Sequence, residues 1–170
     1  MNKFANAALR FLAENWGTIL EGAEGADMIG VNRATLRTRI AKEQAMAMRD
    51  TEGRERGRVE YTPLHLVYNM IYDALARFNS VPENEREWIF ILTEQIGRDL
   101  REGKFNQGMV IRATKRDGKT KVSVFNNFEQ LEQFTGEPVV VIPIGDMILR
   151  FAGTLAMKHN TDAMRELMAD

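Results

Sequence analysis

Hydrophobic residues recur every three or four positions through most of the first 103 residues. This spacing predicts amphipathic helices over about 2–20, 23–29, 32–48, 62–79 and 82–102. Gly22, Gly30 and Gly103 mark helix ends, and Thr62-Pro63 is a typical N-cap and first-turn pair. The 62–79 segment is apolar around most of its circumference, which indicates a helix that is central to its domain or shared with a second subunit.

The period of the pattern changes to two after residue 103. Residues 109–114 and 120–125 alternate between apolar and polar, and Asp117-Gly118 between them is a strong hairpin signal. This turn sets a register in which Arg116, Thr114 and Arg112 lie opposite Lys119, Lys121 and Ser123. These six polar residues then share one face, and the other face carries Met109, Ile111, Ala113, Val122 and Val124.

Further elements complete the predicted fold. Asn127 is the expected cap of a short helix over 128–134, and the β-branched run 139–142 predicts a strand that is buried on both faces and pairs with the hairpin. A helix over 144–159 follows, and then a short Met-rich helix from Thr161 that either docks on a partner or frays. The fold class is therefore α+β, with an N-terminal three-helix helix-turn-helix domain and a C-terminal domain of helices packed on a small sheet with a hairpin.

Residues 26–40 have the pattern of a helix-turn-helix. Ala26 is small enough for a second helix to pass closely, and Gly30 suits a turn that needs positive φ. Asn32 is the expected N-cap of the next helix, in which Leu36 and Ile40 face inward. The side chains left outside are Arg33, Thr35, Arg37, Arg39 and Lys42. A helix face of this composition suits the major groove of DNA and its flanking phosphates.

The segment Gly-Val-Asn-Arg-Ala-Thr-Leu-Arg-Thr-Arg-Ile at 30–40 resembles the DNA-binding module of the Fis family, which includes the factor for inversion stimulation and the C-terminal domains of NtrC-type activators. The similarity covers about residues 10–45. It implies that Asn32, Arg33, Thr35 and Arg37 contact DNA, and that Leu36 and Ile40 belong to the core. The chain departs from the family because Thr38 and Arg39 replace a lysine pair and because the module precedes the rest of the chain. An ordinary helical hairpin with surface arginines has the same turn signature.

The net charge of −1 by itself argues against a nucleic-acid binder, but the distribution of charge favours one. Basic residues outnumber acidic residues by 8 to 4 over 33–58 and by 6 to 1 over 104–121. In the first island we expect Arg33 and Arg37 to read bases, and Asn32, Thr35, Arg39 and Lys42 to hold the DNA backbone. The second island makes the hairpin cations a possible second DNA contact, with an ordinary solvated strand face as the alternative: Arg112, Arg116, Lys119 and Lys121.

Residues 49–60 contain two glycines, alternating charges and one apolar residue, which predicts a charged linker. It divides the chain into a helix-turn-helix domain over 1–48 and an oligomerisation or regulatory domain over 61–170. Arg54, Arg56 and Arg58 suit a flexible arm on phosphates as well as a solvated linker.

Several kinds of site are not indicated. The chain has no cysteine, and no glycine-rich phosphate loop appears. His65 and His159 lack ligand-spaced neighbours, so we expect helix-surface or capping roles for them. We therefore expect no enzyme activity, no metal and no cofactor. No apolar run is long enough to span a bilayer and no signal peptide is apparent, which predicts a cytoplasmic protein without a membrane partner.

We interpret the chain as a sequence-specific, nucleoid-associated transcriptional regulator from a prokaryote or phage that binds double-stranded DNA. One helix-turn-helix reads few base pairs, so we expect a homodimer through residues 61–170, most simply through the 62–79 helix, with RNA polymerase as a possible further contact. Two alternatives stay open. One is a small terminase-like DNA-packaging subunit that forms a ring, and the other is a protein-interaction module with a vestigial helix-turn-helix.

Overall fold

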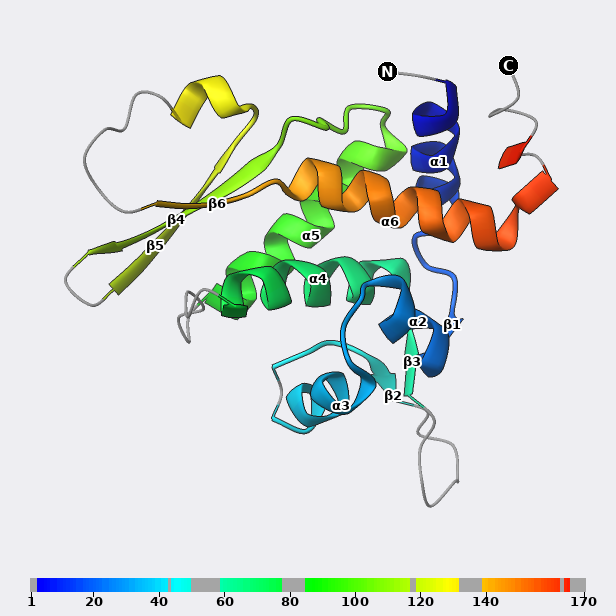
Figure 1. The fold of residues 1–170 in the computed structure, drawn as a ribbon, viewed down its shortest axis with the longest axis horizontal. Helices are drawn as coiled ribbons and strands as arrows, with labels where there is room; N and C mark the ends of the chain where they lie inside the picture. The colour runs from blue at the N-terminus through cyan, green and yellow to red at the C-terminus, as the bar shows by residue number, and fades with distance from the viewer. Residues whose placement is uncertain are drawn as a thin grey trace.

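The fold of the chain is α+β, as predicted. The computed structural model describes residues 3–42, 44–49, 59–77, 85–116, 119–131, 139–162 and 164–165. Within these ranges six α-helices and two three-stranded antiparallel sheets are present (Figure 1). The helices form the body of the molecule, and the larger sheet extends from one side of it.

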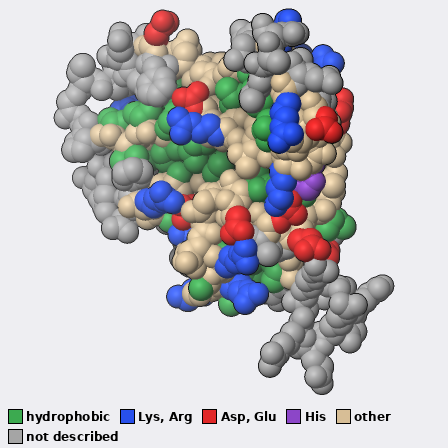
Figure 2. All heavy atoms as spheres, turned by 45° about the vertical axis from the view of Figure 1, so that its right-hand side comes forward, with side chains coloured by type: hydrophobic (Ala, Val, Ile, Leu, Met, Phe, Trp, Pro, Cys, Tyr) green, Lys and Arg blue, Asp and Glu red, His purple; other side chains and the backbone are tan. Residues whose placement is uncertain are grey.

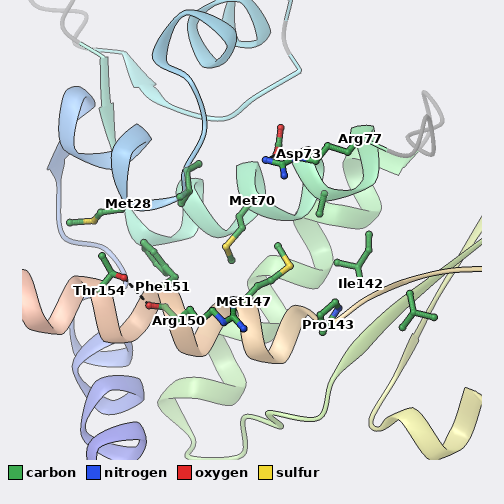
Figure 3. A pocket seen from close by; sticks show the side chains of 13 residues that line it. Met28, Met70, Asp73, Arg77, Ile142, Pro143, Met147, Arg150, Phe151 and Thr154 are labelled. Carbon is green, nitrogen blue, oxygen red and sulfur yellow. Dashed lines mark hydrogen bonds and ion pairs between the residues drawn. The ribbon is translucent and has the colours of Figure 1, made fainter. Parts of the chain in front are cut away.

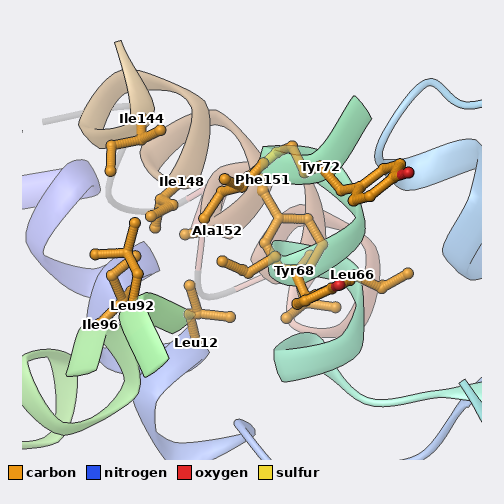
Figure 4. Close-up of a cluster of buried hydrophobic side chains, with 14 of the residues drawn as sticks. Leu12, Leu66, Tyr68, Tyr72, Leu92, Ile96, Ile144, Ile148, Phe151 and Ala152 are labelled. Atoms are coloured by element: carbon orange, nitrogen blue, oxygen red, sulfur yellow. The ribbon is translucent and has the colours of Figure 1, made fainter. Parts of the chain in front are cut away.

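Helix α4 (Pro63–Arg77) lies at the centre of the helical body. Helix α5 (Glu85–Arg101) packs along it, and α6 (Ile144–His159) crosses α1 (Lys3–Glu14) (Figure 1). Fully buried side chains from all four helices meet in one hydrophobic core (Figure 4): Leu12, Leu66, Ile96 and Ile148. The apolar stripes read from the sequence therefore face one another, which is how amphipathic helices remove apolar surface from water.

The surface of α4 is covered by its own chain. Its buried residues lie on every side of the helix and include two polar ones, Asn69 and Asp73. Most of the apolar circumference of α4 is thus buried within one chain, so the described part of the 62–79 helix offers little apolar surface to a second copy. The homodimer itself stays a prediction.

A small sheet that the sequence did not predict adjoins α4. Strands β1 (Leu20–Glu21), β2 (Met48–Arg49) and β3 (Val59–Tyr61) pair in the order β1-β3-β2. Residues 49 and 59–60, which were placed in the linker, thus lie in strands, and residues 50–58 are outside the described residues. Buried residues from both sides of the predicted linker, such as Ile40 and Tyr61, belong to one hydrophobic cluster, and the domain division at 49–60 stays a prediction.

Two of the predicted helix ends are wrong, for local reasons. Helix α1 ends at Glu14 rather than near 20, because the chain turns there and enters β1. Helix α3 (Arg33–Ala41) ends well before 48. The amide of Asn69 holds Met46 in an extended segment, since it accepts from the Met46 N–H and donates to the Met46 carbonyl, both at 2.8 Å.

The unit predicted from three N-terminal helices does not form as expected. Helix α1 has its main contacts with α6 and α5. Helix α2 (Gly22–Met28) instead contacts β1, β3, α3 and α6. The small sheet and α4 therefore support α2 and α3 from the inner side. The sequence interpretation had placed the first helix in that position.

The larger sheet confirms the predicted hairpin register. Strands β4 (Val110–Arg116) and β5 (Lys119–Phe125) pair with Arg116 opposite Lys119 and Thr114 opposite Lys121. Ile111 and Ala113 are buried, while Asp117-Gly118 lies outside the described residues. Strand β6 (Val139–Ile142) pairs with β4, as expected, in the order β5-β4-β6. It is an edge strand whose first three residues are only half-buried, so the prediction of burial on both faces is wrong.

Two of the helix caps predicted from the sequence are confirmed. Asn127 Oδ1 accepts from the Gln130 N–H at 3.1 Å and begins the short turn η1 (Phe128–Leu131); the expected continuation to 134 lies outside the described residues. Thr62 caps α4 through its hydroxyl, which accepts from the His65 N–H at 3.4 Å. His65 returns the contact, because its Nδ1 accepts from the Thr62 N–H at 3.1 Å. Past α6, Met164 is buried in the core of the same chain.

The capping contact of His65 predicts a pH-dependent stability. Burial lowers the pKa of His65 below its ordinary value of 6.5, so the unfolded chain binds this proton more readily than the folded one. The stabilisation is therefore complete above about pH 6.5 and is lost as the pH falls through the folded-state pKa. We expect the urea midpoint to fall between about pH 7.5 and pH 5.5.

His65→Gln should remove this dependence, because glutamine at the third helical position makes the same reciprocal cap without titrating near neutral pH. His159→Gln is the matched control and should retain it. If His65→Gln and the wild type lose stability in parallel on acidification, the titrating cap is refuted.

Candidate nucleic-acid interface

A sharp turn joins α2 to α3. Gly30 has a φ of +65°, which an L-residue with a Cβ atom adopts only under strain. The Val31 N–H donates to the Ala26 carbonyl at 3.2 Å and thereby closes the turn. Ala26 is almost fully buried, in agreement with its expected role at the close approach of the two helices.

The start of α3 has the predicted cap. Asn32 Oδ1 accepts from the N–H groups of Ala34 at 2.8 Å and Thr35 at 3.4 Å. Leu36 and Ile40 are buried, as expected from their spacing. These contacts fix which side of α3 faces outward, because each residue of the helix is rotated by a constant angle from the one before.

The outward side of α3 carries the cations. Arg33, Thr35, Arg37 and Lys42 are all exposed. Helix α3 lies at the end of the molecule opposite α1 (Figure 1), and Lys and Arg side chains gather at the level of this helix in Figure 2. The face is therefore open to a large polyanion that approaches from outside.

Arg33 forms an ion pair across the turn. Its Nη2 and Nε donate to the two carboxylate oxygens of Asp27, with the Nε–Oδ1 distance at 3.3 Å. The hydrogen bond from Arg33 holds the pKa of Asp27 below its ordinary value. Both side chains remain more than half exposed, at 54% and 64%, so water competes for the pair and Arg33 can exchange its partner.

Arg39 has a different environment from Arg33 and Arg37. Its Nη1 donates to Asp73 Oδ1 of α4 at 2.7 Å, and its guanidinium lies 5.6 Å from the centre of the Tyr72 ring. The side chains of Arg39 and Asp73 are only 18% and 11% exposed. Asp73 Oδ2 accepts from Arg77 Nε at 2.8 Å as well. Arg39 thus fastens α3 to α4 and does not belong to the outward face on which the sequence interpretation placed it.

Sequence reasoning missed Asn69 and Asp73, which hold the chain around α3 in place. The available signal was the presence of two polar residues, four positions apart, on a helix that is apolar around most of its circumference. Buried polar groups of this kind are normally hydrogen-bonded, so they indicate partners elsewhere in the chain.

The structure describes only part of the second cationic surface. Lys121 is exposed and Arg112 is half-buried, on the face of the hairpin expected for both. The side chains of Arg116 and Lys119 lie outside the described residues, so the four-cation face stays a prediction.

The remaining candidate chemistry is sparse. His159 Nε2 and Lys158 Nζ each lie 2.8 Å from Glu24 Oε1, which ties the end of α6 to α2. In the described part of the chain, no group of three His, Asp or Glu side chains is placed to hold a metal ion. None of the helices in that part has the length and hydrophobicity to cross a membrane.

No model of a protein family matches the chain, and no curated protein matches it with significant similarity.

The burial of the Arg39–Asp73 pair predicts that removing Asp73 lowers the unfolding free energy more than removing the exposed Asp27 does. Asp73→Ala leaves the largely buried guanidinium of Arg39 without its acceptor, which should cost about 3 kcal/mol of unfolding free energy in urea titrations. Asp27→Ala is the matched control, since it removes the acceptor of an exposed arginine, and its urea midpoint should stay at the wild-type value. Equal midpoints for the two variants would contradict the structural role of Arg39.

The positive φ at Gly30 predicts that an alanine there destabilises the protein more than an alanine at Gly17. Gly30→Ala places a Cβ in the left-handed region and should lower the unfolding free energy by about 1–2 kcal/mol. Gly17→Ala is the control, because Gly17 has no positive φ and a Cβ there meets no atom within 4 Å. Thermal unfolding of both variants measures the effect. A Gly30→Ala protein as stable as Gly17→Ala would mean that the turn does not need its glycine.

Proposed function

We propose that this protein is a sequence-specific DNA-binding transcriptional regulator in which α2, the turn at Gly30 and α3 act as a helix-turn-helix. The observation that carries the proposal is the outward face of α3, where cations and hydroxyls are exposed beside a capped and sharply turned helix start. An α-helix fits the major groove, where guanidinium groups read guanine edges and flanking cations bind phosphates.

The roles of the residues follow from their positions. Arg33 and Arg37 would read bases, and Thr35 and Lys42 would bind the DNA backbone. Asn32 uses its side-chain oxygen for the cap, so its amide nitrogen is the group that would donate to a phosphate. Arg39 is left out of this set because it is bonded to Asp73. Asp27 opposes binding, since its carboxylate holds Arg33 and repels phosphate.

The first sheet gives independent support. The order β1, α2, α3, β2 and β3, with β3 between the other strands, is the order of elements in winged helix-turn-helix domains. It departs from the three-helix unit that the hydrophobic spacing predicted. In both arrangements the helix that directly follows the turn is the one that would be presented to DNA.

A regulator of this kind needs two copies, because a single helix reads few base pairs. With α4 buried, the described surface of residues 61–170 that suits a second copy is on α5, where Phe90 and Ile91 are 39% and 55% exposed. We propose that the protein acts as a homodimer on DNA in the cytoplasm. Light scattering tests this directly: a dimer supports it, and a larger ring favours a DNA-packaging subunit instead.

The decisive experiment is selection from a random-sequence DNA pool, followed by fluorescence anisotropy titrations over a salt series. Arg33→Ala and Arg37→Ala should each weaken the selected site by about 1–3 kcal/mol and relax its sequence preference. Lys42→Ala should weaken all sequences alike and reduce the salt slope by about one. Asp27→Asn should change affinity in the opposite direction, because it removes a negative charge from the same face.

Arg10→Ala is the control, since Arg10 is exposed on α1, at the end of the molecule opposite α3. It should bind as the wild type does. Selection that yields no motif, or Arg33→Ala and Arg37→Ala proteins with wild-type affinity and preference, would refute the proposed interface.

A further inference from the structure

A cavity of about 550 Å³ opens between α4 and α6, beside the end of α2 (Figure 3). Met70 and Met147 extend into it from the two opposite helices, and Phe151 and Met28 continue its apolar lining. Its size lies within the range of small-molecule sites. Methionine side chains are flexible and polarisable, so such a lining adapts to apolar groups of varied shape.

The charges along the cavity favour an anion. Arg77 and Arg150 line it and are exposed, Arg77 to 66% of its side chain. Asp73 is the carboxylate in the lining, and both of its oxygens already accept from arginines. Arg39 and Arg77 both pair with Asp73, and Arg150 lines the cavity from α6, so guanidinium groups outnumber carboxylates by three to one among these residues. The excess of positive charge makes the entry of a second carboxylate favourable.

We propose that this cavity binds a small carboxylate with an apolar body. The carboxylate would form paired hydrogen bonds with Arg150, assisted by Arg77, and the apolar part would lie among the methionines and Phe151. Guanidinium groups bind carboxylates in this bidentate way more strongly than neutral donors do. Apolar contact alone would not distinguish such a ligand from an alcohol of the same size.

The cavity also adjoins the contacts that place α3. Met28 and Ile29, the last residue of α2 and the first of the turn, line it. Asp73, which holds Arg39 of α3, lines it too. A ligand carboxylate that bonds to Arg77 in place of Asp73, or an apolar part of the ligand that displaces Met28, would change the contacts that position α3. This coupling rests on the proposed function, and it requires that ligand and DNA alter each other's affinity by the same factor.

The binding test uses 8-anilinonaphthalene-1-sulfonate, a fluorescent apolar anion, with octanoate and octan-1-ol as competitors and no DNA present. Octanoate should displace the probe at about tenfold lower concentration than octanol, as expected for one charge-assisted hydrogen bond. Arg150→Gln should weaken octanoate by about the same factor. Circular dichroism checks that the variant is folded, which its exposed position favours.

Arg10→Gln is the matched control, because Arg10 lines a different cavity of about 640 Å³ beside α1 and α5. It should bind octanoate as the wild type does. Equal displacement by octanoate and octanol overturns the proposal, and so does an Arg10→Gln protein that loses as much affinity as Arg150→Gln. Met147→Trp, which places a larger and more rigid side chain in the cavity, should weaken octanoate binding, and undiminished binding in this variant also overturns the proposal.

The coupling test then adds the selected DNA. Saturating octanoate should change DNA affinity at least about fivefold in the wild type and not in Arg150→Gln. Octanoate binding through Arg150 in a protein without DNA affinity would refute the proposed function and leave the ligand site in place. DNA binding without octanoate binding would refute the site. If the protein binds both octanoate and DNA but neither ligand changes the affinity for the other, the coupling is refuted.

Discussion

The burial of α4 is the constraint on which the other parts of this structure depend. A helix covered by its own chain on nearly every side must satisfy any polar group that it carries. Asn69 and Asp73 do so with partners from the segment around α3, Met46 and Arg39. The central helix therefore determines both where α3 ends and how it is fastened to the body. Loss of either polar side chain would leave a polar or charged group of the α3 segment without its acceptor.

Three arginines of one short helix illustrate how environment decides their use. Arg33, Arg37 and Arg39 differ little in sequence context, since all lie in the same basic segment. Arg39 is mostly buried against Asp73 and Tyr72, where an ion pair is held firmly. Arg33 is paired with Asp27 in water, where the pair is exchangeable. Only the exposed arginines can give their hydrogen bonds to another molecule at little cost, and this difference underlies the proposed DNA interface.

The cavity between α4 and α6 connects these two themes. Its wall contains Asp73, so the group that fastens α3 is also within reach of a small ligand. In the proposed function, signals between a ligand and α3 require contacts that both can change, and the Arg39–Asp73–Arg77 cluster would be such a contact. Apolar residues would often stabilise such a position as well as buried charges do. A ligand site beside α3 would therefore give a reason for the charged Arg39–Asp73–Arg77 cluster.

The sequence by itself determined the features that depend on neighbours a few residues away. Helical spacing located the main helices, Asn32 and Thr62 were recognised as caps, and alternation with a two-residue turn gave the register of β4 and β5. The tertiary structure alone decided that α1 packs on α6, that two- and three-residue strands join into a sheet, that β6 lies at an edge, and that Arg39 turns inward. Strands so short carry no periodic signal, and the partner of a buried charge depends on which distant surfaces meet. Local patterns specify what each segment can form, whereas burial against the rest of the chain selects which of its side chains remain available to other molecules.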